Sequence, residues 1–344
     1  MSEIYGPLSP TEAFERLAGK GFEDIVLNAL TKSVEKRKPS YFLFGDGTPS
    51  ALLGHVLKNR LGWDFTPITY GFGDDSPSLL RAPTLAEAIG IKNLEPVKIS
   101  PDELVNSLVE ISRFSRDKDI FTAFSGIPRY YGARLLQQNR KVMLLGDFAN
   151  ELGGGFTLDR VLPTPEAKKK NLEENREYNL SPVTDIAKGL EVDDRFVFPY
   201  ADDEFVNTIL EKVPVWAHAM LIDTPMAATS YAQRELDKGL EPKEYTYIYG
   251  NMLWRRTLFV ALLQKELGHT ADDALRLSFL PKIPINLGVG DLAMTKVLEE
   301  DISDEQNTRL ERMYRENPPD EPWLLATRAA RALYYRREQA GLVA

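Results

Sequence analysis

Short apolar runs alternate with segments of helical periodicity along the first half of the chain. The apolar runs predict buried strands, at residues 41–44, 67–72, 94–99 and 141–146. Strands that alternate with helices are typical of a parallel sheet. We therefore predict an α/β fold, in which a parallel-sheet core is followed by a mainly helical C-terminal part.

The first predicted strand runs into a short turn that contains glycine. Gly45, Asp46 and Gly47 form this turn. The helical pattern that follows has Thr48 as its predicted N-cap and Pro49 at its first position. Such a turn favours an anion, because free backbone N–H groups and the helix dipole point toward it. The same pattern also occurs in α/β connections that bind no ligand.

The fourth apolar run ends in an acidic loop closed by glycines. Asp147, Asn150 and Glu151 come soon after Gly146, and the glycines at 153–155 allow the backbone to approach a ligand closely. Open α/β sheets bind ligands at the carboxyl ends of their strands, where these side chains are predicted to lie. The alternative is a glycine-rich turn with solvated acids, and this segment alone does not separate the two.

Four segments follow one another in the order of known sequence motifs. The pyrophosphate-loop motif Ser-Gly-Gly-Leu-Asp-Ser-Ser is similar to residues 44–50, and Gly-Glu-Gly-Ala-Asp-Glu-Leu-Phe-Gly-Gly-Tyr is similar to residues 146–156. Arg-Val-Pro-Phe-Leu-Asp is similar to residues 198–202, and Lys-Glu-Gln-Phe-Ser-Asp-Gly-Val-Gly to residues 282–290. In these segments the chain resembles the synthetase domain of asparagine synthetases, β-lactam synthetases and lasso-peptide cyclases. The resemblance implies an adenine nucleotide alpha-hydrolase-like core with a divergent pyrophosphate loop and no glutaminase domain.

The resemblance also implies a nucleotide site and two catalytic groups. The residues expected to bind ATP or AMP are Gly45, Asp46, Gly47, Thr48, Ser50, Tyr70, Gly71, Phe72 and Gly146. Asp147 stands at the family's general acid/base position, and Lys282 matches the lysine that stabilises charge during acyl transfer. The alternative interpretations are a surface carboxylate and a lysine that precedes a proline-containing loop.

The chain departs from the family at the magnesium site. The two family aspartates that hold Mg²⁺ against the ATP phosphates correspond here to Thr48 and Asn150. Mg²⁺ prefers carboxylate and phosphate oxygens, so its binding should be weakened unless Asp46, Asp147 or Glu151 takes over as a ligand. Asp46 also brings negative charge to the phosphate loop, and Pro49 removes a backbone donor from it.

Two functions therefore stay open. One is an ATP-dependent amide-forming ligase, which adenylates a small-molecule or peptide carboxylate and passes the acyl group to a nitrogen nucleophile. The other is a catalytically inactive pseudoenzyme that serves as a binding or assembly module. The presence of Asp147 and Lys282 favours the ligase, and the loss of both metal aspartates favours the module.

The composition limits the cellular locations and the binding partners that we expect for the protein. The 344 residues carry a formal net charge of −9 and include no cysteine. An acidic chain is not expected to bind nucleic acid. The absence of a long apolar run and of a signal sequence predicts a cytoplasmic protein without membrane contact. Because no thiol is present to cut glutamine, the nitrogen is expected from solution, from the substrate, or from a separate amine-donor or glutaminase partner.

We predict four regions along the chain. They are an N-terminal helical extension (1–40), a pyrophosphate-loop-like α/β core (41–156), a polar excursion (157–192) and the mainly helical remainder of the synthetase-like domain (193–344). The charges of the third region favour a solvated loop over a phosphate-binding lid. His55 and His218 lie in apolar runs, which predicts core residues rather than ligands. The aromatic core candidates of the last region are Trp216, Tyr245, Tyr249, Trp254 and Phe259.

Overall fold

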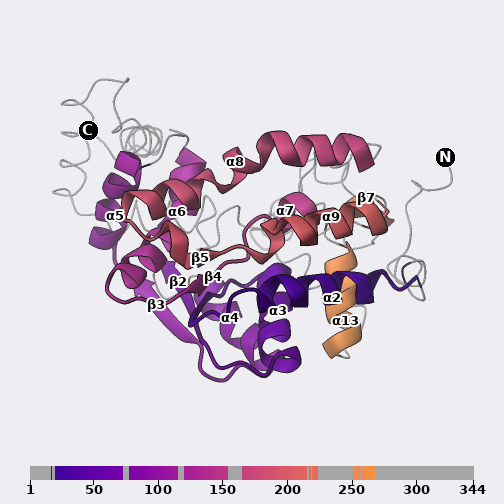
Figure 1. The fold of residues 1–344 in the computed structure, drawn as a ribbon. Helices are drawn as coiled ribbons and strands as arrows, with labels where there is room; N and C mark the ends of the chain where they lie inside the picture. The colour runs from indigo at the N-terminus through magenta and orange to yellow at the C-terminus, as the bar shows by residue number, and fades with distance from the viewer. Residues whose placement is uncertain are drawn as a thin grey trace, which may run out of the picture.

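A parallel five-stranded sheet forms the centre of the computed structural model, which confirms the predicted α/β class (Figure 1). The residues that the structure describes are 17, 20–72, 77–114, 120–153, 165–214, 217, 219–223, 251–255 and 257–267. The strands of the sheet are β1 (Tyr41–Leu43), β2 (Thr66–Phe72), β3 (Glu95–Ile99), β4 (Met143–Leu144) and β5 (Phe196–Val197). Their order is β3-β2-β1-β4-β5, and every neighbouring pair is parallel.

Helices cover both faces of the sheet. Below it in Figure 1 lie α2 (Phe22–Glu35), α3 (Thr48–His55) and α4 (Pro77–Ala88). Above it lie α5 (Pro101–Phe114), α6 (Ile120–Gln137) and α8 (Pro165–Gly189). The remaining helices are α7 (Ala149–Leu152), α9 (Asp203–Lys212) and α13 (Thr257–Leu267), together with a π-helical turn (Val56–Arg60) and two 3₁₀ turns (Asp193–Arg195 and Pro199–Ala201). In the described part of the chain, no helix is long and apolar enough to cross a membrane.

Alternate residues of the central strands feed two separate cores. In β4, Leu144 belongs to the core between α3 and the sheet, while Met143 belongs to the core between α6 and the sheet. This follows from the twofold period of a strand, which sends successive side chains to opposite faces. Helix α6 approaches β4 closely at Gly132, where an added Cβ would lie 2.7 Å from the sulfur of Met143. The strand that precedes the acidic loop is therefore fixed by packing on both sides.

The predicted solvated loop at 157–192 is wrong for most of its length. Residues 165–189 form the long helix α8, and Val183, Ile186 and Ala187 on it are buried. The spacing of these three residues is helical, but the lysine and glutamate content of the preceding turns obscured it. A polar composition therefore marks the exposed side of this helix rather than an irregular excursion. The division into four regions stays a prediction.

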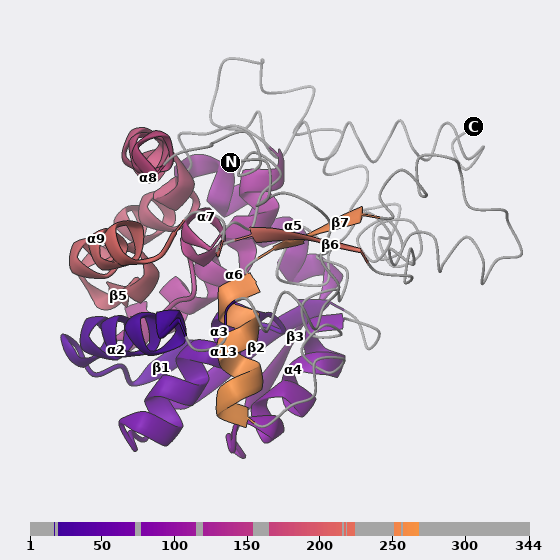
Figure 2. The same cartoon turned by 90° about the vertical axis from the view of Figure 1, so that its right-hand side faces the viewer.

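The described part of the last region contains strands as well as helices. β6 (Ala219–Asp223) and β7 (Asn251–Arg255) pair in antiparallel fashion. We predicted mainly helical structure here, since short apolar runs do not by themselves separate a strand from a helix. Phe259 is buried, as predicted, and its helix α13 packs against α2 and α3 (Figure 2). Trp254 lies in β7, and the core candidates Trp216, Tyr245 and Tyr249 lie outside the described residues.

His55 is a satisfied core residue, as predicted. Its side chain is buried, and the amide nitrogen of Asn59 donates to its Nδ1 at 3.0 Å. Since Nδ1 accepts this bond, Nε2–H donates to a carboxylate oxygen of Glu266 on α13, at 3.1 Å. Burial lowers the pKa of His55, and the Glu266 carboxylate opposes this effect without cancelling it. The neutral imidazole therefore links α3 to α13. His218 lies outside the described residues.

We expect the pH dependence of stability to reflect this histidine. Because folding lowers the pKa of His55, its contribution is complete above the unfolded pKa of about 6.5 and is lost as the pH falls through the folded value. Urea unfolding of the wild type and of His55→Gln at several pH values between 7.5 and 5 should show a flatter pH dependence in the variant. His218 and His269 remain in both proteins, so their titration cancels. Equal pH dependence in the two proteins would contradict this role.

Candidate functional site

The first candidate loop connects β1 to α3 at the carboxyl edge of the sheet. Gly47 is the N-cap of α3, because its carbonyl accepts the first helical bond, from the N–H of Ala51 at 3.1 Å. The helix consequently begins at Thr48, one position earlier than we predicted, and Thr48 is its first residue rather than its N-cap. The N–H of Gly45 donates to Oγ of Ser50 at 3.0 Å. This bond closes the turn, and it engages a backbone donor that an anion would otherwise meet.

The second candidate loop follows β4 and lies directly against the first. A Cβ built on Gly146 would be 3.8 Å from Pro49 Cβ and 3.8 Å from Ser50 Oγ. The parallel pairing of β1 with β4 brings about this contact, because the two strands end at the same edge of the sheet. Tyr200 supports the arrangement, since its buried hydroxyl donates to the carbonyl of Pro49 at 2.9 Å. The structure thus brings together three of the four segments that carry the family resemblance.

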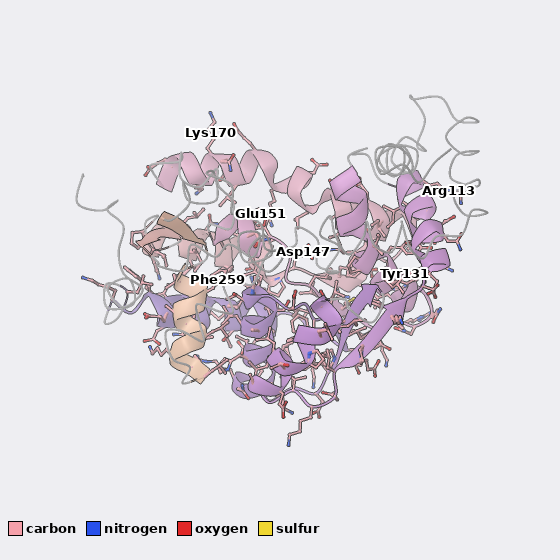
Figure 3. All side chains as sticks on the ribbon, turned by 180° about the vertical axis from the view of Figure 1, so that it is seen from behind. Arg113, Tyr131, Asp147, Glu151, Lys170 and Phe259 are labelled. Atoms are coloured by element: carbon pink, nitrogen blue, oxygen red, sulfur yellow. The ribbon has the colours of Figure 1, made fainter. Side chains whose placement is uncertain are left out.

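Asp147 forms a buried ion pair that the sequence analysis did not anticipate. Nη2 of Arg129, on α6, donates to Oδ1 of Asp147 at 2.5 Å. The exposed fractions of the two side chains are only 8% and 15%. Figure 3 places Asp147 near the middle of the molecule, with Glu151 close by. Removing a charged side chain from water costs free energy, so such a charge is normally paired with an opposite one. Here Asp147, the predicted acid/base group, is one member of such a pair.

The position of Arg129 in the sequence indicates that its side chain is buried. Arg129, Ala133 and Leu136 are spaced by four and three residues, which places them on one side of α6, and all three are buried. An arginine on an apolar helical stripe is unusual and calls for a partner. The sequence does not identify that partner, because Asp147 lies 18 positions further along the chain.

Comparison with known proteins places the chain in a family. The sequence profile named asparagine synthase matches residues 22–238, which is more than half of the chain. The chain belongs to the asparagine synthase family. This confirms the resemblance that the four segments indicated.

Two relatives illustrate how distant the similarity is. A probable asparagine synthetase [glutamine-hydrolyzing] of Acanthamoeba polyphaga mimivirus is 27% identical over 198 residues, which cover 54% of this chain and 35% of that protein. An asparagine synthetase [glutamine-hydrolyzing] of Bos taurus is 26% identical over 284 residues, which cover 75% of this chain and 48% of that protein. The matched segments span about a third and about half of the length of these two relatives.

Phe148 supports the alignment of the second motif with the asparagine synthase family. The family motif has glycine at this position, and Phe148 adopts the left-handed conformation, with φ of 73°. Residues other than glycine rarely adopt it, at a cost of about 1–2 kcal/mol. The Phe148 ring is buried in the core between α3 and the sheet, and this burial offsets the cost of the conformation. The backbone at Phe148 thus has a conformation that glycine adopts readily, which agrees with the glycine of the family motif.

The metal site of the asparagine synthase family does not fit the residues present. Thr48 and Asn150 stand at the two family aspartate positions, and the Thr48 hydroxyl is buried without a hydrogen-bond partner among the described residues. In the described ranges, no three side chains of histidine, cysteine, aspartate or glutamate gather as a metal site would require. The roles of Asp46 and Glu151 as metal ligands stay predictions.

The remaining predicted site residues lie at the end of β2, except for one that lies outside the described part of the chain. Tyr70, in β2, is buried in the core between α6 and the sheet and stacks on Tyr131, with 5.6 Å between ring centroids. Burial raises the pKa of Tyr70, which keeps its phenol neutral. Only the backbone of Tyr70 is therefore available for the predicted nucleotide contact. Lys282 lies outside the described residues.

We expect the Arg129–Asp147 pair to contribute strongly to stability. Arg129→Met leaves a buried carboxylate unpaired, which should lower the free energy of unfolding by about 3–5 kcal/mol. Arg129→Met combined with Asp147→Asn should recover a large part of this loss, because no buried charge is then left alone. Urea unfolding measures both effects. The exposed pair Arg113–Glu110 is the control, and its removal should cost about 0–1 kcal/mol. Additive effects at Arg129 and Asp147 would contradict the pairing.

Proposed function

We propose that the protein is an asparagine synthetase-like, ATP-dependent ligase that forms an amide bond. A small-molecule or peptide carboxylate attacks the α-phosphorus of ATP, pyrophosphate leaves, and a nitrogen nucleophile then displaces AMP from the acyl carbon. The closeness of Gly146 to Pro49 and Ser50 carries this proposal, because the two loops that resemble the family's nucleotide-site motifs lie side by side at the carboxyl edge of the sheet.

The N-terminus of α3 is the proposed position of the nucleotide phosphate. Its first N–H groups have no partner within the helix, and they attract an anion together with the helix dipole. Adenosine would lie along the backbone at the end of β2. The loop itself is degenerate: the N–H of Gly45 is engaged by Ser50, Pro49 has no N–H, and Asp46 is acidic. These features favour a short phosphate group over a polyphosphate.

Acyl transfer requires a positive group near the acyl carbon and a base for the amine proton. In our proposal Lys282 stabilises the negative charge that develops on the acyl oxygen. Asp147 takes the amine proton, for which its contact with Arg129 has to open during the reaction. Ammonia from solution, or an amine supplied by a separate donor or glutaminase partner, provides the nitrogen. No step of this proposal is routed through a metal ion.

The second candidate is a catalytically inactive module that binds nucleotide or a protein partner. The ion pair between Asp147 and Arg129 favours it, because a carboxylate held in a buried pair is poorly placed to take a proton. The uncharged residues at both family metal positions, Thr48 and Asn150, point the same way. The two candidates share the nucleotide site and differ in whether chemistry follows binding.

Turnover separates the two candidates. The ligase proposal predicts that the protein releases AMP from ATP when a suitable carboxylate and ammonium are supplied, as measured by chromatography over a panel of amino-acid and peptide carboxylates. Lys282→Ala should lower the rate by about a hundredfold or more, since one oxyanion-type donor is lost, and should leave AMP affinity unchanged. AMP binding without AMP formation over the whole panel would favour the inactive module.

A further inference from the structure

We propose that the buried Arg129–Asp147 pair provides the counter-charge that the family obtains from magnesium, so that this site binds a phosphate monoester without a divalent cation. The inference rests on the proposed nucleotide site and goes beyond it, because it assigns a role to a residue of α6 and specifies the class of ligand. The starting point is the mismatch between the family's metal site and the residues present, Thr48 and Asn150.

Asp147 is an obstacle to any anion that approaches this edge of the sheet. It follows Gly146, and the position of a Cβ on Gly146 is 3.8 Å from both Pro49 and Ser50 in the first turn of α3. In our proposal this puts its carboxylate beside the phosphate position. Charges in a region of low dielectric act on each other strongly, so an uncompensated carboxylate would oppose phosphate binding.

Arg129 removes this obstacle. A guanidinium stays protonated at every accessible pH, and the one of Arg129 is held 2.5 Å from Oδ1 of Asp147. Arg129 is buried and only 15% of the Asp147 side chain is exposed, so solvent and salt screen this pair less than they screen a surface pair. A metal ion neutralises carboxylates in the same manner, but it must be acquired from solution. Here the counter-ion is part of α6.

Thr48 provides a second, independent observation. Its hydroxyl lies at the first residue of α3, is buried and has no hydrogen-bond partner among the described residues. Burying a hydroxyl without a partner costs free energy, and a phosphate oxygen that accepts from it would recover this cost. The hydroxyl and the free N–H groups of the first helical turn are neutral donors. They suit an anion that arrives without a metal.

The charge of the site defines the ligand class. Because the Arg129 guanidinium is paired with Asp147, the helix N-terminus and the neutral donors leave the site with little net positive charge, which matches a single phosphate group of limited charge. Asp46, in the turn before α3, adds negative charge that disfavours a triphosphate. We therefore assign to the site a nucleoside monophosphate or an acyl adenylate, and AMP is the probe that tests this assignment.

Calorimetry with AMP, in EDTA and then in excess Mg²⁺, tests the inference. AMP should bind with the same affinity in both buffers, and Mg·ATP should bind no more tightly than AMP. Asp147→Asn should strengthen AMP binding, because it removes the repelling charge and leaves the guanidinium in place. Arg129→Met should weaken AMP binding by about tenfold or more.

Matched controls separate this local effect from a change in net charge. Arg113→Met removes a positive charge from the exposed end of α5, well away from Asp147 in Figure 3. Asp24→Asn removes a negative charge from an exposed pair with Lys265. Both controls should leave AMP affinity unchanged. If Arg129→Met does not fold, the double variant Arg129→Met/Asp147→Asn replaces it, and it should bind AMP about tenfold more weakly than Asp147→Asn alone.

The outcomes distinguish this inference from the proposed function. Nucleotide binding only in the presence of Mg²⁺, or weaker binding by Asp147→Asn, would overturn the inference and leave the proposed nucleotide site standing. Absence of binding by AMP and ATP in both buffers would overturn the nucleotide site and the inference with it. Metal-independent AMP binding that Arg113→Met reduces as much as Arg129→Met does would also overturn the role of Arg129.

Discussion

The parallel pairing of β1 with β4 is the constraint on which the candidate site depends. Since the two strands end at the same edge, the turn before α3 and the loop after β4 must meet there. Gly146 lies within van der Waals reach of Pro49 and Ser50, and Tyr200 holds Pro49 through a buried hydrogen bond. Packing of α6 onto β4 at Gly132 fixes the second strand further. The position of the site is thus a property of the backbone.

The electrostatics of the site differ from those that the resemblance to the family implies. Phe148 adopts the left-handed conformation at a position where the family motif has glycine, the residue that adopts it most readily. At the family's metal positions stand the uncharged Thr48 and Asn150, and the remaining carboxylate Asp147 is joined to Arg129. A site with one internal ion pair has different requirements for a ligand from a site built around a metal ion.

The sequence predicted those parts of the fold that depend on local pattern. The four strand predictions fall on β1 to β4, and the glycine-containing turns lie at the expected edge. Helix α8 was missed because its charged residues outnumber the apolar stripe that carries its buried side. The Arg129–Asp147 pair could not be predicted, because a partner 18 positions away is defined by how α6 lies on β4 and not by spacing. Long-range pairs of this kind need the tertiary structure.

We expect the backbone of the two loops to be able to hold a metal ion once carboxylates stand at positions 48 and 150, where this chain has Thr48 and Asn150. The most direct measurement is calorimetry of ATP, with and without Mg²⁺, on the variant Thr48→Asp/Asn150→Asp, with Phe44 left in place because its ring is buried in the core. The account predicts that the variant gains ATP affinity in Mg²⁺ by about tenfold or more and gains none in EDTA. A folded variant that shows no Mg²⁺-dependent gain would contradict the alignment of both loops with the family.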